Sequence, residues 1–390
     1  MRTAEDGYPR GVSVTELGLP GLRAASVARH DPARPDDPRL IDRFGRVATD
    51  LRVSLTDRCN LRCTYCMPAE GLDWTPKDEL LTDDEIVRLV GIAVRQLGIN
   101  EVRFTGGEPL LRKGLESVLH QVSELDPRPE ISLTTNGIGL ARRAEALKAA
   151  GVNRLNVSLD TLRPDRFATI TRRSRLSDVL DGMAAARAAG LNPVKVNTVL
   201  LRGVNDDEAP ALLRYCLEEG YQLRFIEQMP LDAQHGWQRS EMITASEILA
   251  SLRREFILTP DPAERGGAPA ERWLVHAGPS SGAPGHASGA PGRGPVVGLG
   301  PVLGTVGVIG SVTRPFCGAC DRTRLTADGQ LRSCLFARGE TDLRALLRGG
   351  ASDEEIADTW RGTMWAKAAG HGIDDPGFLQ PDRPMSAIGG

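Results

Sequence analysis

Short apolar runs alternate with helical patterns through the middle of this sequence, and that alternation limits the fold more than any other feature. Six runs rich in β-branched or other apolar residues are typical of strands: 50–55, 101–105, 131–135, 154–159, 194–200 and 222–227. Strands that alternate with helices predict parallel pairing with right-handed crossovers. We therefore expect an α/β fold, in which a barrel, a partial barrel and a doubly wound sheet would all show this alternation.

The helical patterns between these runs have recognisable ends. The spacing T-x-x-E at Thr82 and again at Thr244 predicts a capping box at the start of a helix. The Ala- and Leu-rich segments 138–150 and 176–189 each end directly before a glycine, the residue that most readily terminates a helix in the left-handed conformation. In either type of fold, the carboxyl ends of the parallel strands are where chemistry gathers.

Composition divides the 390 residues into four parts. Residues 1–41 are rich in Arg, Asp, Pro and Gly without periodicity, and we expect a disordered arm there. Residues 261–300 are dominated by Gly, Pro, Ala and Ser and predict a flexible insertion. The insertion would separate the α/β part at 42–260 from a C-terminal region at 301–390.

Charge and hydropathy exclude several classes of function. The net charge of −3 provides no overall field for nucleic acid or anionic lipid, so any phosphate site must be a local arginine cluster. No apolar run approaches the roughly 20 residues that span a membrane, and the start of the chain lacks the pattern of a signal peptide. We expect a cytoplasmic protein without nucleic-acid or membrane partners.

Six of the seven cysteines fall into two tight groups. The first has the spacing C-x3-C-x2-C and the second C-x2-C-x13-C; they are Cys59, Cys63 and Cys66, and Cys317, Cys320 and Cys334. Without an export signal, such grouping favours metal ligation over disulfides. Three thiolates on a four-iron cluster leave one iron open to an outside ligand. A structural zinc knuckle, the simpler alternative, prefers paired C-x2-C units and four ligands.

The neighbours of the second group refine this interpretation. Cys216 lies in an apolar helical run and is expected in the core, while His371 is a conceivable fourth ligand. A second four-iron cluster with an open iron fits the trio better than zinc does. Arg322 and Arg324 follow Cys320 at alternate positions, so an extended segment would place both guanidiniums on one face, where they could bind phosphate oxygens.

A second motif follows the next predicted strand. Gly106-Gly107-Glu108-Pro109 would let the backbone approach a ligand closely, because glycine has no Cβ. Together with C-x3-C-x2-C it resembles the radical S-adenosylmethionine (SAM) superfamily. The resemblance implies a partial (β/α)6 barrel of the TIM type with a C-terminal iron-sulfur extension. It also implies that SAM binds the open iron and is cleaved by one electron to a 5′-deoxyadenosyl radical.

The complete set of motifs resembles one branch of that superfamily, molybdenum cofactor biosynthesis protein A, the GTP 3′,8-cyclases. The similarity includes Thr134-Thr135-Asn136-Gly137, the Arg-rich second cysteine loop and a terminal Gly389-Gly390. It implies two [4Fe-4S] clusters, SAM, GTP as substrate and an external one-electron reductant. The implied reaction removes the C3′ hydrogen of GTP and joins C3′ to C8, giving 3′,8-cyclo-7,8-dihydro-GTP for a cyclic pyranopterin monophosphate synthase. A monomer or a homodimer would suit this role.

The resemblance assigns roles to individual positions. GTP contacts would fall on Arg52, Arg103, Thr134, Lys195, Arg322 and Arg324. SAM contacts would fall on Tyr65, Gly107, Ser158 and Met229. The catalytic set would comprise Cys59, Cys63, Cys66, Arg322, Arg324 and a tail reaching into the site, Gly389 and Gly390.

Two alternatives of other kinds remain open. A radical SAM enzyme that modifies a peptide could use the C-terminal cluster as an electron relay, although such enzymes usually carry more than three C-terminal cysteines. A non-catalytic iron-sulfur electron carrier would need neither six β/α units nor an open iron.

Overall fold

The computed structural model of the chain describes residues 31–278 and 299–389. The predictions for 1–30, 279–298 and Gly390 lie outside the described residues. Order begins earlier than predicted, because β1 (Leu40–Ile41) pairs with β2 (Val47–Ala48) and the Leu40 side chain is fully buried. The predicted disordered arm is therefore wrong for residues 31–41.

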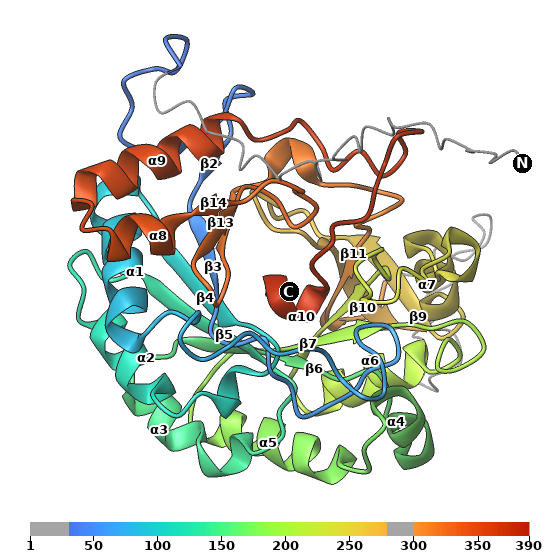
Figure 1. Cartoon of the computed structure of the whole chain (residues 1–390). Helices are drawn as coiled ribbons and strands as arrows, with labels where there is room; N and C mark the ends of the chain where they lie inside the picture. Colours follow the sequence, from blue (N-terminus) through green and yellow to red (C-terminus); the bar gives the residue numbers. More distant parts are fainter. Residues whose placement is uncertain (1–30, 279–298, 390) are drawn as a thin grey trace, which may run out of the picture.

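One curved sheet of twelve strands organises the described chain, in the order β14-β13-β12-β3-β4-β5-β6-β7-β8-β11-β10-β9. Its strands are β3 (Asp50–Ser54), β4 (Glu101–Thr105), β5 (Glu130–Thr135), β6 (Arg154–Ser158), β7 (Val194–Val199), β8 (Gln222–Ile226), β9 (Phe256–Pro260), β10 (Glu271–Ala277), β11 (Val302–Ile309), β12 (Arg322–Leu325), β13 (Gln330–Arg332) and β14 (Thr341–Asp342). All six predicted strands form, as β3 to β8. The edge strands β14 and β9 do not pair with each other, so the sheet is a partial barrel, as predicted (Figure 1).

The C-terminal region extends this barrel at both sides. Strand β12 pairs in parallel with β3, and β11 pairs in parallel with β8, so eight consecutive strands run in the same direction. Strand β10 (Glu271–Ala277) pairs with both β9 and β11. The prediction of a flexible insertion is thus wrong over 271–277, which belong to the sheet.

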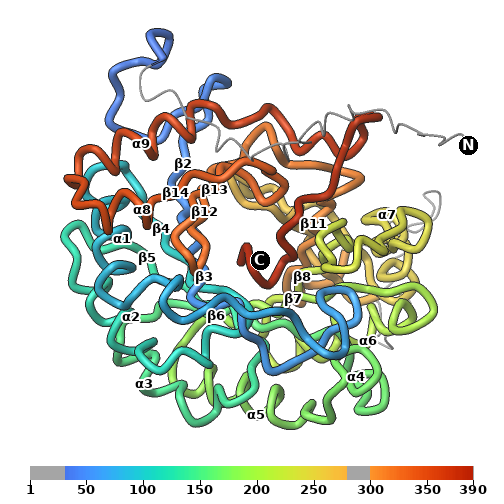
Figure 2. Tube along the Cα trace, in the orientation of Figure 1, coloured from blue at the N-terminus to red at the C-terminus, as the bar shows by residue number. Residues whose placement is uncertain are grey.

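Helices cover the outside of the curved sheet, and the chain ends at its centre (Figures 1 and 2). They are α1 (Asp83–Leu97), α2 (Leu115–Ser123), α3 (Ala144–Ala149), α4 (Pro164–Thr171), α5 (Leu176–Ala188), α6 (Ala209–Glu218), α7 (Ala245–Leu252), α8 (Leu343–Arg348) and α9 (Asp353–Trp365). The short helix α10 (Met385–Ile388) instead lies inside the barrel, at its centre (Figure 1). Both predicted capping boxes form, at Thr82 and Thr244. The segment predicted at 138–150 divides into a 3₁₀ turn (Leu140–Arg142) and α3. No helix within 31–278 or 299–389 is long and apolar enough for a membrane span.

The two faces of the sheet differ sharply in chemistry. Residues such as Leu51 and Val53 face the helices and are fully buried in the apolar core, where each contributes about 1.5–3 kcal/mol. The alternate residues face the inside of the barrel and are polar or charged, as Arg52, Ser54 and Arg103 are. An interior lined by polar and charged side chains can bind a polar ligand whose charges compensate those of the side chains.

Candidate active site

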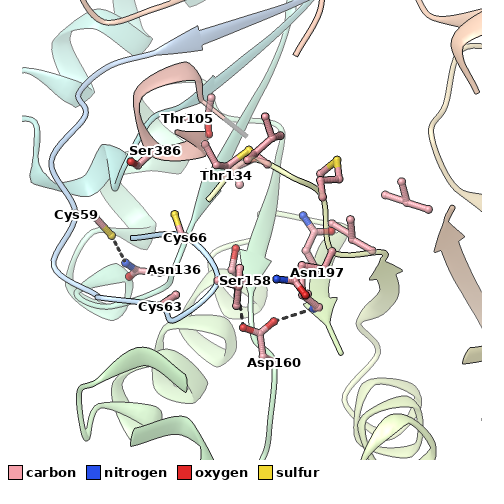
Figure 3. A pocket seen from close by; sticks show the side chains of 18 of the residues that line it. Cys59, Cys63, Cys66, Thr105, Thr134, Asn136, Ser158, Asp160, Asn197 and Ser386 are labelled. Carbon is pink, nitrogen blue, oxygen red and sulfur yellow. Dashed lines mark hydrogen bonds between the residues drawn. The ribbon is translucent and has the colours of Figure 1, made fainter. Parts of the chain in front are cut away.

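A cavity of about 300 Å³ opens at the carboxyl ends of the parallel strands. Its walls receive side chains from β3 to β8 and from β12, together with the loops that follow β3 and β4. Figure 3 shows the thiols of Cys59, Cys63 and Cys66 close to Asn136 and Ser158 in this cavity. The position agrees with the expectation that chemistry gathers at these strand ends.

The first cysteine loop is fixed by its neighbours. Arg62 and Thr64 donate backbone hydrogen bonds to the end of α4, at 3.0 and 2.9 Å. The Leu61 backbone N–H lies 3.4 Å from Cys59 Sγ, and the Asn136 amide approaches the same sulfur at 3.8 Å (Figure 3). The thiols therefore stand on a preorganised loop with donors directed at sulfur, as cluster ligands require.

Burial also changes the acidity of the three thiols in this loop. Burial raises the pKa of Cys59, raises that of Cys63 well above its usual range, and raises that of Cys66 to about 12. Such groups become thiolates when a metal supplies the compensating positive charge. The three side chains would therefore hold a [4Fe-4S] cluster at the wall of this cavity, and three thiolates would leave one iron free for an outside ligand.

The Gly-Gly motif packs against the start of that loop. Gly107 donates its backbone N–H to Thr56 O at 2.7 Å, and Gly106 has a φ of +141°. A Cβ would lie 2.4 Å from Thr56 O at Gly106 and 2.3 Å from Arg58 O at Gly107. Any side chain would displace the cysteine loop, so both glycines are required by this close approach.

Glu108 of the same motif is a structural carboxylate. It is fully buried and accepts hydrogen bonds from Leu110 N, Thr135 Oγ1 and Asn136 N at 2.7–3.0 Å. Burial, only partly offset by these donors, raises its pKa to about 7. Glu108 thereby fixes the end of β5 and the position of Asn136 beside the first cysteine.

Tyr65 is tied to an acidic residue that was not predicted in the site. Its hydroxyl donates to Asp160 Oδ2 at 2.8 Å, while Val199 N donates to the other carboxylate oxygen at 2.9 Å. Burial raises the pKa of Asp160 to about 6. Asp160 therefore links the cysteine loop to the ends of β6 and β7. Tyr65 lines the cavity together with the other predicted SAM contacts, Gly107, Ser158 and Met229.

A buried cluster of arginine and lysine side chains lies inside the barrel. The predicted phosphate contacts Arg52, Arg103, Thr134, Arg322 and Arg324 all line the cavity. Lys195 does not, because it occupies the position before Asn197 on the inner face of β7 and so lies deeper in the barrel. The neighbours Arg154 and Arg224 complete the cluster around Lys195.

This cluster has more positive than negative charge. Its carboxylates are Asp50, Glu101, Glu130 and Asp321, against the cations Arg52, Arg103, Arg154, Lys195, Arg224, Arg322 and Arg324. Burial and the neighbouring cations lower the pKa of Lys195 to about 8 and those of Arg224 and Arg324 to about 9.

Several of these guanidiniums are also incompletely hydrogen-bonded. The buried Nε atoms of Arg52, Arg224 and Arg322 have no hydrogen-bond acceptor within the described structure. A buried N–H group without an acceptor is costly. The cavity is therefore built to receive an anion with several oxygens.

The second cysteine group lies beside the same cavity. Cys317 and Cys320 bracket the turn between β11 and β12, and Cys334 follows β13. Their neighbours Phe316, Arg322 and Leu335 line the cavity, although the three sulfurs themselves do not. Among the described residues, no three Cys, His, Asp or Glu side chains gather around a point as ligands of a single metal ion would.

The surroundings of this second group are cationic. Lys367 Nζ lies 3.4 Å from Cys320 Sγ, and Arg322 Nη1 lies 4.0 Å from it. Burial acts to raise the pKa of the Cys320 thiol, but the Lys367 and Arg322 charges outweigh it and lower that pKa. Cys320 is thereby favoured as a thiolate, the form that ligates iron.

The two residues weighed as further ligands have other roles. His371 Nε2 lies 3.0 Å from Ser311 O, and Nδ1 accepts from Ile373 N at 3.1 Å, so neither ring nitrogen is free for a metal. The idea of His371 as a fourth ligand is therefore wrong. Cys216 is fully buried in the apolar core, as predicted.

The C-terminal tail enters the barrel. Met385 and Ser386 of α10 line the cavity, and Arg324 Nη1 donates to Gly389 O at 2.5 Å. Gly389 has a φ of +84°, and a Cβ there would lie 2.8 Å from Thr105 Cγ2. The predicted entry of the tail is confirmed as far as Gly389.

Comparisons with known proteins agree with this geometry. Residues 53–216 match the profile of the Radical SAM superfamily, and residues 296–373 match that of Molybdenum Cofactor Synthesis C. The GTP 3′,8-cyclase of Streptomyces coelicolor is 65% identical over 363 residues, which are 93% of this chain and 99% of the relative. This chain belongs to the GTP 3′,8-cyclase family of radical SAM proteins.

Other relatives extend the comparison. The GTP 3′,8-cyclase of Mycolicibacterium smegmatis is 61% identical over 97% of this chain and 100% of its own length. Among solved structures, methylornithine synthase (PylB) superposes with a TM-score of 0.40 and 18% identity, over 53% of this chain and 62% of that one.

The lining residues that were absent from the predicted site include four with polar side chains at strand ends: Asn136, Asp160, Asn197 and Arg224. Arg224 could have been found, because it occupies the inward position two residues before the end of β8. Its Nη2 donates to Asn156 Oδ1 at 2.6 Å. Asn197 Oδ1 is buried without a partner, which marks it as a further contact for a bound ligand.

Proposed function

We propose that this chain is a GTP 3′,8-cyclase that converts GTP to 3′,8-cyclo-7,8-dihydro-GTP. The observation that carries the proposal is that one cavity is lined by both the first cysteine trio and a buried, incompletely paired arginine cluster. The near full-length similarity to proteins named GTP 3′,8-cyclase supports the same conclusion.

The first trio would hold the radical source. Cys59, Cys63 and Cys66 would bind a [4Fe-4S] cluster, and Tyr65, Gly107, Ser158 and Met229 would contact SAM. When bound, the cluster and SAM supply a carbon radical able to remove a hydrogen atom from the substrate. The protein fixes the Tyr65 ring through Asp160, and α10 adds Met385 and Ser386 to the cavity wall.

The basic cluster would hold the triphosphate. Arg52, Arg103, Arg322, Arg324 and the newly located Arg224 present guanidiniums whose planar forks match phosphate oxygens. Thr134 would add a hydroxyl, and Lys195 would act from below through its charge. Fixing the phosphates would hold C3′ and C8 of the nucleotide where the radical forms, which removes much of the entropic cost of reaction.

The remaining assignments concern the second trio and the tail. Cys317, Cys320 and Cys334 would bind the second [4Fe-4S] cluster, with its open iron facing the guanine. Gly389 and Gly390 would complete the catalytic set, since Arg324 already binds the Gly389 carbonyl. An external one-electron reductant, a cytoplasmic location and transfer of the product to a cyclic pyranopterin monophosphate synthase complete the proposal.

A peptide substrate is disfavoured by the same geometry. A peptide offers few charges to compensate a buried group of arginines in a cavity of about 300 Å³. A nucleoside triphosphate supplies several oxygens in a compact group.

The proposal is tested by anaerobic incubation of the reconstituted protein with SAM, dithionite and GTP. We expect 5′-deoxyadenosine to form when GTP is present, in an amount proportional to that of the cyclic nucleotide. Formation of 5′-deoxyadenosine only with an added peptide, and never with GTP, would refute the proposal.

A further inference from the structure

Lys367 is a buried cation that the proposed reaction does not use. It follows α9 (Asp353–Trp365) and is only 3% exposed. Its ammonium lies 3.4 Å from Cys320 Sγ, 3.3 Å from Cys320 O and 2.9 Å from Arg322 O. Three acceptors use the three N–H bonds of a lysine ammonium. No carboxylate within the described chain forms an ion pair with Lys367.

The lack of a carboxylate identifies the intended partner. A buried ammonium is expensive unless a negative group lies beside it. The two carbonyls are dipoles, so the Cys320 sulfur is the one contacting atom that can carry a full negative charge, as a metal-bound thiolate. The position of Lys367 is therefore explained by a cluster that Cys320 ligates.

We propose that Lys367 is a positioning residue for the second cluster and that its N–H···S contact with Cys320 raises the reduction potential of that cluster. Positive charge and hydrogen bonds at a ligating sulfur stabilise the reduced cluster, which carries the additional electron. The inference rests on the proposed function, since it requires that Cys317, Cys320 and Cys334 bind a [4Fe-4S] cluster.

Arg46, directly before β2, provides a matched control because it contacts the same two segments, at Cys317 and beside Lys367. It donates to the carbonyl oxygens of Cys317, Ala368 and Ala369 at 2.6–2.8 Å, and its charge is balanced by Asp42 at 2.5 Å. Unlike Lys367, it makes no hydrogen bond to a cysteine sulfur within the described structure. R46K would loosen the loop while leaving its charge unchanged.

The experiment is an anaerobic redox titration of the holoenzyme, followed by electron paramagnetic resonance, for wild type, K367M, K367R and R46K. Iron content is measured first, and about eight irons per chain establish that both clusters are present. The signal absent from C320A identifies the second cluster. Only about four irons per wild-type chain would show that the second cluster is absent, and would contradict this part of the proposed function.

With both clusters present, we expect the second cluster of K367M to have a more negative midpoint potential than that of wild type. K367R, which retains charge and donors, and R46K should remain near the wild-type value, and the first cluster should not move. An unchanged potential in K367M, or an equal shift in R46K, would overturn the inference. If K367M loses the second cluster, K367Q takes its place: a lowered potential supports the inference and a wild-type potential overturns it.

Discussion

The two cysteine loops carry equal numbers of thiols in opposite electrostatic surroundings. Around the first trio, the charged groups that act on Cys63 and Cys66 include the carboxylates Asp160 and Asp232. The donors that approach Cys59 are a neutral backbone N–H and a neutral amide. Such surroundings do not favour an additional electron on a cluster held there.

Around the second trio, the charges are reversed. Lys367 contacts Cys320 directly, and Arg322 lies close to the same sulfur. Burial raises the pKa of Cys317, but the pKa of Cys320 is lowered, whereas burial raises those of all three thiols in the first loop. Under the proposed function, one fold gives two similar ligand sets different tasks: a strong reductant beside SAM and an electron-poor ligand site beside the substrate.

The largest expected effect comes from comparing two variants, each of which removes one thiol from one of the two cysteine loops. C63A should abolish SAM cleavage, because the site for the radical source is lost. C320A should abolish the cyclic nucleotide while a slow, GTP-independent SAM cleavage persists. Chromatography of 5′-deoxyadenosine and of the cyclic product distinguishes the two variants, and identical behaviour would show that the loops do not have separate tasks.

The second prediction concerns the basic cluster. R324A should raise the apparent KM for GTP about 10- to 100-fold, because a charged hydrogen bond of about 1.5–3 kcal/mol is lost. R224A should behave similarly, since Arg224 lines the same cavity. SAM binding, measured by equilibrium dialysis without GTP, should remain near the wild-type value. A normal KM in both variants would contradict the phosphate assignment.

The third prediction uses the buried carboxylate behind the first loop. The pKa of Glu108 is about 7 when folded and 4.5 in its ordinary state, so the folded protein retains a proton that the unfolded chain has lost between these values. Stability of the apoprotein should therefore fall as the pH rises from about 4.5 to 7, by about 3 kcal/mol.

A matched variant isolates this carboxylate. E108Q removes the titrating group, so denaturant unfolding across the same pH range should lose that part of the slope. An equal slope in wild type and E108Q would show that Glu108 does not cause it.

The smallest expected effect tests the link between Tyr65 and Asp160. Y65F leaves Asp160 Oδ2 without its donor, which should cost about 1–3 kcal/mol of unfolding free energy. The first cluster should still assemble, because the three thiols are unchanged. Iron content and denaturant midpoints measure the two effects, and an unchanged midpoint would mean that the hydrogen bond contributes nothing.

The sequence was most informative where local patterns determine structure. The strands β3 to β8 begin and end within a residue of their predicted bounds, because each apolar run is bordered by a turn or a helix cap. Strand β10 (Glu271–Ala277) was missed since its alternating residues lie in a segment dominated by Gly and Pro. Its place is set by pairing with β9 and β11, which local composition does not encode.

In the candidate site, too, local motifs were predictable from the sequence, whereas contacts between distant residues were not. Motif residues such as Gly107 and Arg324 were found because their spacing is distinctive. Lys195 was expected at the substrate because of the family resemblance, and alternation allows it to face inward. Its depth along the strand, however, depends on the assembled barrel. Asp160 joins Tyr65 across 95 positions of the chain, a contact that only tertiary structure reveals.

Transfer of hydrogen from the substrate to the radical source tests the central claim most directly, because it requires both to share one chamber. GTP deuterated at C3′ is incubated anaerobically with the reconstituted protein, SAM and dithionite. The deuterium content of the 5′-deoxyadenosine is then measured by mass spectrometry. We predict that it gains one deuterium per cyclic nucleotide formed. Cyclic product accompanied by unlabelled 5′-deoxyadenosine would contradict the account.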